Sequence, residues 1–172
     1  MKRHVVLVGL PGSGKSAVGR LVARALEVRS HDVDAAVERL CGASVREIFT
    51  TRGESEFRRL EKLETERLLG GPPAVIVPGG GWAAVPGNLE TTRGRALTVY
   101  LETSPDTAAQ RTAHSDDRPL LDGPDRGERL KDLLTARGRF YASCDVTVST
   151  EDRTAEQVAA EVVELAQRAH GG

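Results

Sequence analysis

The sequence GLPGSGKS at residues 9–16 constrains the fold more than any other feature of the chain. It fits the pattern G-x-x-x-x-G-K-[S/T], in which glycines let the backbone curl so that its N–H groups converge on phosphate oxygens. An apolar run at residues 5–8 precedes it, and a helical pattern over residues 15–26 follows it. The positive end of that helix would favour an anion. A strand, a loop and a helix in this order predict a nucleotide-binding α/β domain.

The rest of the chain alternates short apolar runs with longer segments of helical periodicity. The runs at residues 74–77, 98–101 and 146–148 have the length and composition of strands. Residues 53–69 repeat apolar side chains at helical spacing. Strands that alternate with helices favour a parallel sheet, so we predict an α/β fold.

Three further helix starts are marked by side chains that cap exposed backbone N–H groups. Two pairs fit the capping box, and one serine precedes a proline at a first helical position. The residues are Ser44 with Glu47, Thr154 with Gln157, and Ser104 with Pro105.

Length and charge narrow the class of protein. The 172 residues are enough for one sizeable core, so we expect a single domain over residues 1–172. The 24 basic and 25 acidic residues give a net charge of −1, which excludes a basic nucleic-acid surface. The first apolar run is too short for a signal or a membrane span. Cys41 and Cys144 lack the spacing of a disulfide framework or a metal site. We expect a cytoplasmic monomer with no nucleic-acid or membrane partner.

Residues 112–125, here named the lid segment, fit no regular element. The segment is polar and contains Pro119, Gly123 and Pro124. A plain connector is one explanation, yet unstructured connections of about a dozen residues are uncommon and are often active-site lids. Its composition offers little apolar surface for burial. We therefore predict that the segment is mobile and closes over bound ligands.

Asp32 and Asp34 follow a weakly apolar run at residues 28–31, where the second strand of such a sheet should end. Ligands in open α/β sheets bind at the carboxyl ends of strands. In an extended chain, acids two residues apart point to opposite sides, so one can serve a metal's water shell and the other a substrate hydroxyl. An Asp-x-Asp pair by itself is more often a solvated helix start, and that alternative stays open.

Arg58 and a run of three glycines are further candidates for acceptor binding. Arg58 has Glu54 and Glu61 one turn away on either side of the predicted helix, so by itself it is better explained as a surface ion-pair residue. The glycines at residues 79–81 directly follow the strand predicted at residues 74–77. A tight turn needs one or two glycines, whereas three permit close approach of a ligand to bare backbone.

Six motifs in order resemble those of the shikimate kinase family over nearly the whole chain. They are GLPGSGKS at residues 9–16, the pair Asp32 and Asp34, EFRRLE at residues 56–61, GGG at residues 79–81, RPLL at residues 118–121 and RGRFY at residues 137–141. The resemblance implies a P-loop NTPase-like fold of three layers, with a five-stranded parallel sheet between helices and a mobile lid. It also implies Mg²⁺-dependent transfer of the ATP γ-phosphoryl group to the 3-hydroxyl of shikimate.

The resemblance assigns roles on the nucleotide side. ATP would be bound by the phosphate loop and by arginines on the lid segment and beside the adenine: Gly12, Ser13, Gly14, Lys15, Ser16, Ala17, Arg111, Arg118 and Arg153. Mg²⁺ would be held by Ser16 and, through its water, by Asp32. Lys15 would place a mobile positive charge on the phosphates, and Arg118 would stabilise charge in the transition state.

The resemblance also assigns the acceptor side. Asp34 would bind ring hydroxyls and help to deprotonate the acceptor, which makes it catalytic together with Lys15 and Arg118. Arg58 and Arg137 would grip the carboxylate, because guanidinium forks donate two parallel hydrogen bonds. Substrate contacts would come from Asp34, Arg58, Gly79, Gly80, Gly81 and Arg137, and the apolar side of the pocket from Pro11, Phe49 and Phe57.

The chain departs from the family pattern at two positions of the expected site. Arg139 stands where the family usually has a proline, and it would add a positive charge near the carboxylate clamp. Ala155 stands where several members of the family have a proline beside the adenine.

Two competing functions also remain. A gluconate or nucleoside monophosphate kinase would share the phosphate loop and lid but lacks this set of motifs. A nucleotide-gated binding module would not need two carboxylate-binding arginines beside a base.

Overall fold

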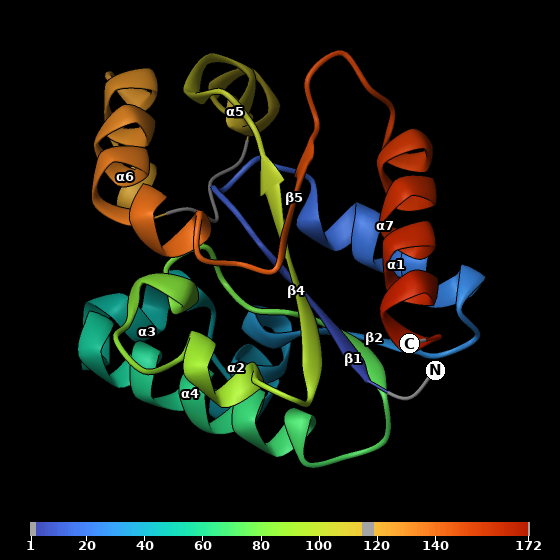
Figure 1. Cartoon of the computed structure of the whole chain (residues 1–172). Helices are drawn as coiled ribbons and strands as arrows, with labels where there is room; N and C mark the ends of the chain where they lie inside the picture. The colour runs from blue at the N-terminus through green and yellow to red at the C-terminus, as the bar shows by residue number, and fades with distance from the viewer. Residues whose placement is uncertain (1–2, 115–118, 172) are drawn as a thin grey trace.

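The computed structural model describes residues 3–114 and 119–171, and its five strands form one parallel sheet (Figure 1). The strand order is β2-β3-β1-β4-β5. The strands are β1 (His4–Val8), β2 (Arg29–Asp32), β3 (Ala74–Val77), β4 (Ala96–Glu102) and β5 (Val146–Ser149). The predicted fold class is confirmed, and each predicted strand is present within a few residues of its expected ends.

Seven α-helices and three short 3₁₀ helices connect the strands in the described part of the chain. The α-helices are α1 (Lys15–Ala25), α2 (Val33–Cys41), α3 (Val45–Arg52), α4 (Glu54–Leu69), α5 (Pro105–Thr112), α6 (Arg126–Tyr141) and α7 (Ala155–His170). The 3₁₀ helices are η1 (Trp82–Ala84), η2 (Leu89–Thr92) and η3 (Pro119–Leu121). All three predicted helix starts are confirmed as N-caps. Thr154 and Gln157 form a complete capping box. Ser44 forms only the half of the box in which its side chain accepts from Glu47 N–H.

The alternation of side chains along β1 explains the three layers. Val5 and Leu7 point into a core shared with α1 and α7, and Val6 and Val8 into a core shared with α2, α3 and α4. Successive strand residues face opposite sides, so a strand apolar on both faces needs helices on both. Figure 1 shows α1 and α7 together on one side of the sheet and α2, α3 and α4 on the other.

Parallel pairing brings the carboxyl ends of neighbouring strands to one edge of the sheet. The phosphate loop follows β1, Asp32 ends β2, and residues 79–81 follow β3. Candidates that lie up to 70 residues apart therefore meet there. Both cysteines are free and pack against the second core. Among the described residues, no helix has the length and apolarity needed to cross a bilayer.

Candidate active site

The conformation of a glycine shapes the phosphate loop, and backbone carbonyls of the loop bind the ammonium group of one lysine. Gly14 caps α1 in the left-handed region, at φ 85°, where a side chain would be strained. Lys15 is buried, and its Nζ donates to the carbonyls of Gly9 and Leu10 at 2.8 and 2.9 Å. In this conformation carbonyls of the loop itself bind the ammonium, and its movement to phosphate oxygens stays a prediction.

Two neighbouring cavities collect the described candidates for ATP binding. One of about 490 Å³ is lined by the phosphate loop, Asp32 and Asp34. A second of about 200 Å³ lies beside Ser13 and Ala155. Both are bordered by Gly14 and Arg111, and the second also by Arg153. The structure thus brings the residues expected beside the adenine close to those expected beside the phosphates.

The two arginines of the smaller cavity are anchored by backbone carbonyls. Arg111 donates to Gly12 O at 3.3 Å and to Thr150 O at 3.2 Å. Arg153 donates to Ser149 O at 2.9 Å and forms an ion pair with Glu161 at 2.7 Å. These contacts fix both guanidinium groups at the edge of the cavity.

The acidic pair occupies the start of a helix. Asp32 ends β2 and caps α2 by accepting from Ala35 N–H at 3.2 Å, while its other oxygen accepts from Ser16 Oγ at 2.8 Å. Asp34 lies in the first turn of α2. The prediction that both acids stand in extended chain is wrong, because the helix begins one residue after Asp32. They still face different neighbours, since Asp34 lies against Gly79 rather than Ser16.

The pair of Ser16 and Asp32 suits a hard cation. A hydroxyl and a carboxylate supply only oxygen, and Mg²⁺ keeps most of its ligands as water and phosphate oxygen. No cluster of three or more His, Cys, Asp or Glu suggests a metal site within residues 3–114 and 119–171. Two protein oxygens beside the phosphate loop fit a metal that travels with its nucleotide.

A narrow cavity of about 60 Å³ gathers the acceptor candidates. Its apolar side is formed by Pro11, Phe49 and Phe57, as expected, with the two phenyl rings 5.2 Å apart. Asp34, Gly79 and Gly80 line both this cavity and the larger phosphate cavity, so the two are contiguous at those residues. Arg58, Gly81 and Arg137 also line this cavity, together with Val45 and residues 119–121 of the lid segment.

The two arginines of the acceptor cavity differ in whether neighbouring carboxylates neutralise their charge. Arg58 donates to Glu61 at 3.0 Å and to Glu54 at 3.3 Å. Arg137 is 7% exposed, and its Nη1 has no hydrogen-bond partner among the described residues. A buried donor without a partner is costly unless a ligand satisfies it. Arg137 therefore marks where an anionic group would bind.

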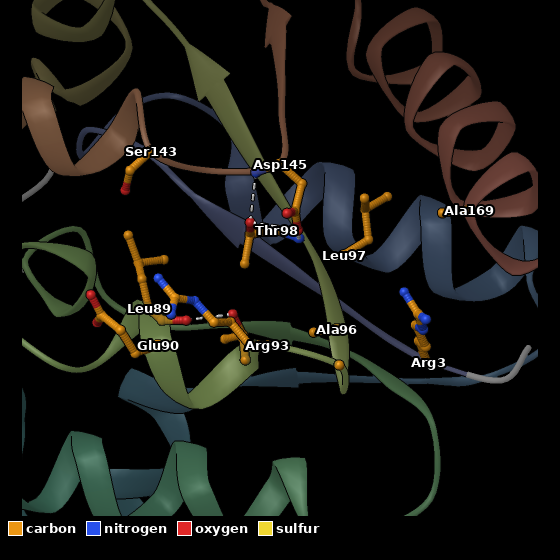
Figure 2. Close-up of a pocket in the computed structure, with 12 residues that line it drawn as sticks. Arg3, Leu89, Glu90, Arg93, Ala96, Leu97, Thr98, Ser143, Asp145 and Ala169 are labelled. Carbon is orange, nitrogen blue, oxygen red and sulfur yellow. Dashed lines mark hydrogen bonds between the residues drawn. The ribbon is translucent and has the colours of Figure 1, made fainter.

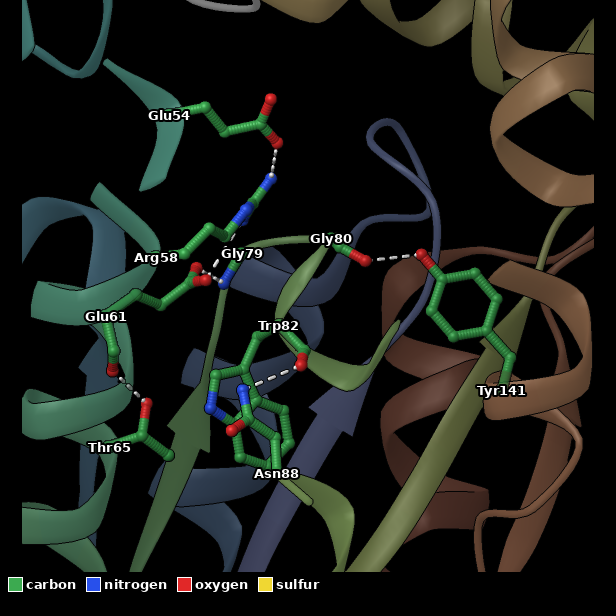
Figure 3. Close-up of polar contacts among 9 residues, drawn as sticks. All are labelled: Glu54, Arg58, Glu61, Thr65, Gly79, Gly80, Trp82, Asn88 and Tyr141. Atoms are coloured by element: carbon green, nitrogen blue, oxygen red, sulfur yellow. Dashed lines mark hydrogen bonds and ion pairs between the residues drawn. The ribbon is translucent and has the colours of Figure 1, made fainter. Parts of the chain in front are cut away.

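Glu61 is a buried acid of the candidate site, although the sequence favoured a surface ion pair with Arg58. It is fully buried, accepts from Gly79 N–H at 2.9 Å and joins that backbone to Arg58 (Figure 3). Burial raises the pKa of Glu61 to about 7, with Arg58 opposing the rise and Asp34 adding to it. The missed signal was spacing, because Glu61 falls on the same helical stripe as Phe57 and Leu68.

The glycine triplet makes room for side chains of the protein itself. A Cβ on Gly79 would meet the carboxylates of Glu61 and Asp34, and one on Gly81 would meet the guanidinium of Arg58. A Cβ on Gly80 would lie 3.0 Å from Arg137 Nη1. Close approach of a ligand is one reason for three glycines here, and the contact of all three backbones with candidate binding groups is a second.

The described part of the lid segment is partly packed. Leu121 is fully buried against Ala108 and Leu130, and Asp122 forms an ion pair with Arg46 at 2.6 Å. The expectation of little apolar burial is wrong at Leu121. Arg118 lies outside the described residues, so its predicted position over the phosphates stays a prediction.

The two departures from the family pattern leave the site's charged groups in place. Arg139 is exposed, with its guanidinium 4.7 Å from the centre of the Phe140 ring, so its charge lies on the surface. Ala155 borders the cavity of about 200 Å³, and its place beside the adenine stays a prediction.

A separate cavity of about 400 Å³ lies at the opposite end of the sheet, beside the start of β4 (Figure 2). Its lining carries both signs of charge, from Arg3, Arg93, Glu90 and Asp145. Asp145 accepts from Thr98 N–H and Oγ at 2.8 and 2.9 Å, which fixes the start of β5 against β4. The Asp145 carboxylate is thus already bound to the sheet.

Comparison with known proteins identifies consistent relatives. The family model for shikimate kinase matches residues 11–167. A shikimate kinase of Cereibacter sphaeroides is 40% identical over 164 residues, covering 95% of this chain and 82% of the relative. The structure of a shikimate kinase from Acinetobacter baumannii in complex with shikimate superposes with a TM-score of 0.93 at 32% identity, over 97% of this chain and 94% of that one. A gluconokinase from Sinorhizobium meliloti, at 20% identity and a TM-score of 0.63, shares the fold alone, over 98% of this chain and 96% of that one.

Proposed function

The chain belongs to the shikimate kinase family, and we propose that its site transfers the γ-phosphoryl group of ATP to the 3-hydroxyl of shikimate. The products are shikimate 3-phosphate and ADP. ATP-dependent phosphorylation of shikimate is the activity that the relatives support, and the position of the hydroxyl follows from the family resemblance.

Arg137 carries the proposal for the acceptor. It is a buried cation whose Nη1 has no hydrogen-bond partner in the described part of the chain, in a cavity with a second guanidinium and a carboxylate. An acceptor with one carboxylate and several hydroxyls matches that set, since the arginines bind the carboxylate while Asp34 accepts from a hydroxyl. An uncharged sugar would leave the two guanidinium groups without an anionic partner.

The proposed division of roles follows the geometry. Backbone N–H groups at the positive end of α1 and the ammonium of Lys15 bind phosphate oxygens. Asp34 lies between the two cavities, where it can orient the acceptor hydroxyl and accept its proton. Mg²⁺, held by Ser16 and Asp32, would offset phosphate charge. We also propose that the monomer is active, because all the proposed site residues come from one chain. Sedimentation at assay concentration tests this oligomeric state.

The decisive experiment follows ADP release from ATP and Mg²⁺ with different acceptors. Shikimate should sustain turnover, whereas gluconate, a nucleoside monophosphate and a no-acceptor control should not. The methyl ester of shikimate keeps the hydroxyls and removes the charge, so it should be a poor substrate. Equal rates with gluconate, or no ADP release with shikimate, would refute the assignment. Binding of ATP without turnover would favour a nucleotide-gated module.

A further inference from the structure

We propose that Tyr141 is a positioning residue for the acceptor, because its hydroxyl fixes the orientation of the Gly80–Gly81 peptide. The inference rests on the proposed function, since it concerns how the same site presents backbone donors to shikimate. Tyr141 lies one turn after Arg137 on α6, so a single helix face carries both groups.

The contact itself is short and partly buried. Tyr141 Oη donates to Gly80 O at 2.5 Å (Figure 3), and the Tyr141 ring stacks on Tyr100 with centroids 5.0 Å apart. Tyr141 is fully buried. Burial also raises its pKa, so the phenol stays protonated and donates.

The hydrogen bonds of the glycine triplet show what this contact achieves. Gly79 N–H donates to Glu61, Gly79 O accepts from Trp82 N–H at 3.1 Å, and Gly81 O accepts from Ala84 N–H at 3.2 Å. Tyr141 takes the remaining carbonyl, that of Gly80. Only the N–H groups of Gly80 and Gly81 make no hydrogen bond to any described residue.

Peptide geometry links the fixed carbonyl to a free donor. The chain has no cis peptide bonds among the described residues, and in a trans peptide the N–H points opposite to the C=O. Holding Gly80 O toward α6 therefore turns Gly81 N–H away from α6. The acceptor cavity is lined by all three glycines, so the two free N–H groups are candidate donors to an oxygen-rich substrate.

The same contact completes a chain of hydrogen bonds between the two arginines. Arg58 binds Glu61, Glu61 binds Gly79 N–H, and Tyr141 binds Gly80 O from the helix that carries Arg137. Loss of the Tyr141 bond would leave the spacing between the two guanidinium groups less fixed. Apparent affinity falls by the fraction of molecules that hold the competent arrangement.

The test compares Tyr141→Phe with Tyr100→Phe. Both variants remove one hydroxyl from the same stacked pair, but only the first removes the bond to Gly80. In the ADP-release assay, Tyr141→Phe should raise KM for shikimate by about 3- to 10-fold, the effect of one lost hydrogen bond, with KM for ATP changed less than about twofold. Tyr100→Phe should change both KM values by less than about twofold.

Hydrogen exchange of residues 78–84 gives a second readout that needs no turnover. Exchange there should be faster in Tyr141→Phe than in Tyr100→Phe, with β4 unchanged in both. Equal shikimate KM values in the two variants, or parallel increases in KM for ATP and shikimate, would overturn the inference. A wild-type protein without shikimate-dependent ADP release would refute the proposed function instead, so the two failures are distinguishable.

Discussion

Replacement of Glu61 by glutamine should remove a pH dependence of folding stability that this one carboxyl creates. Glu61 is fully buried, and burial is the main cause that raises its pKa from 4.5 to about 7, with Asp34 adding to the rise. The folded state therefore binds the Glu61 proton more tightly than the unfolded state does. Stability falls with increasing pH wherever the folded state binds more protons.

The magnitude follows from the size of the shift. A shift of one pKa unit is worth about 1.4 kcal/mol, so the wild type should lose about 2 to 3 kcal/mol relative to Glu61→Gln between roughly pH 5 and pH 8. His4 and His31 have lowered pKa values, mainly because of burial, and give a slope of the opposite sign. Comparing the two proteins cancels their contribution.

The measurement is urea unfolding of both proteins at several pH values across that window. The difference in free energy of unfolding, wild type minus variant, should decrease steadily as pH rises through 7. Glu54→Gln is the matched control, because it removes the exposed carboxylate on Arg58 and leaves the buried one in place. Parallel curves for wild type and Glu61→Gln would show that Glu61 is ionised throughout and that the reasoning is mistaken.

Substitutions at the arginine clamp, the phosphate loop and the acidic pair test the proposed roles. Arg137→Ala should weaken shikimate binding by about 2 kcal/mol or more, since it leaves a desolvated carboxylate unpaired, while Arg139→Ala should not; calorimetry that shows equal affinities would exclude the clamp. Lys15→Ala should lower the rate of ADP release by about 10²-fold or more in a folded protein, checked by circular dichroism. Near-normal turnover would contradict its assigned role. Asp32→Asn should raise the Mg²⁺ concentration for half-maximal rate and recover in excess Mg²⁺, whereas Asp34→Asn should lose about 10²- to 10⁴-fold at any Mg²⁺ concentration. Identical curves of rate against Mg²⁺ concentration for both variants would show that the two acids do not have separate roles.

The phosphate loop and the strands could be predicted because their signals are local. A glycine-rich loop between an apolar run and a helix has few alternative conformations, and apolar runs of four or five residues need cover on both faces. Helix starts at Ser44, Ser104 and Thr154 were equally local, since a capping side chain bonds a backbone group three residues away. The candidate residues around the site also followed from motifs, once their order matched one family.

Prediction failed at two positions for different reasons. Asp34 was expected in extended chain, yet Asp32 caps a helix that begins at once, which is a local signal and agrees with the alternative of a helix start. Leu121 was expected in a polar segment with little to bury, yet it packs against Ala108 and Leu130 from two helices. Only the result for Leu121 depends on where other elements lie.

The sequence by itself determined the fold class, the phosphate loop and the set of charged groups that the chemistry requires. Only the tertiary structure decided which of those charges are neutralised. Arg58 and Arg137 are the same residue type in the sequence, but the packing of α4 against the end of β3 buries Glu61 beside the first, whereas Nη1 of the second has no hydrogen-bond partner among the described residues. Burial and pairing are properties of distance in space, and residues 58, 61, 79, 80, 137 and 141 become neighbours only when the parallel sheet brings its strand ends together.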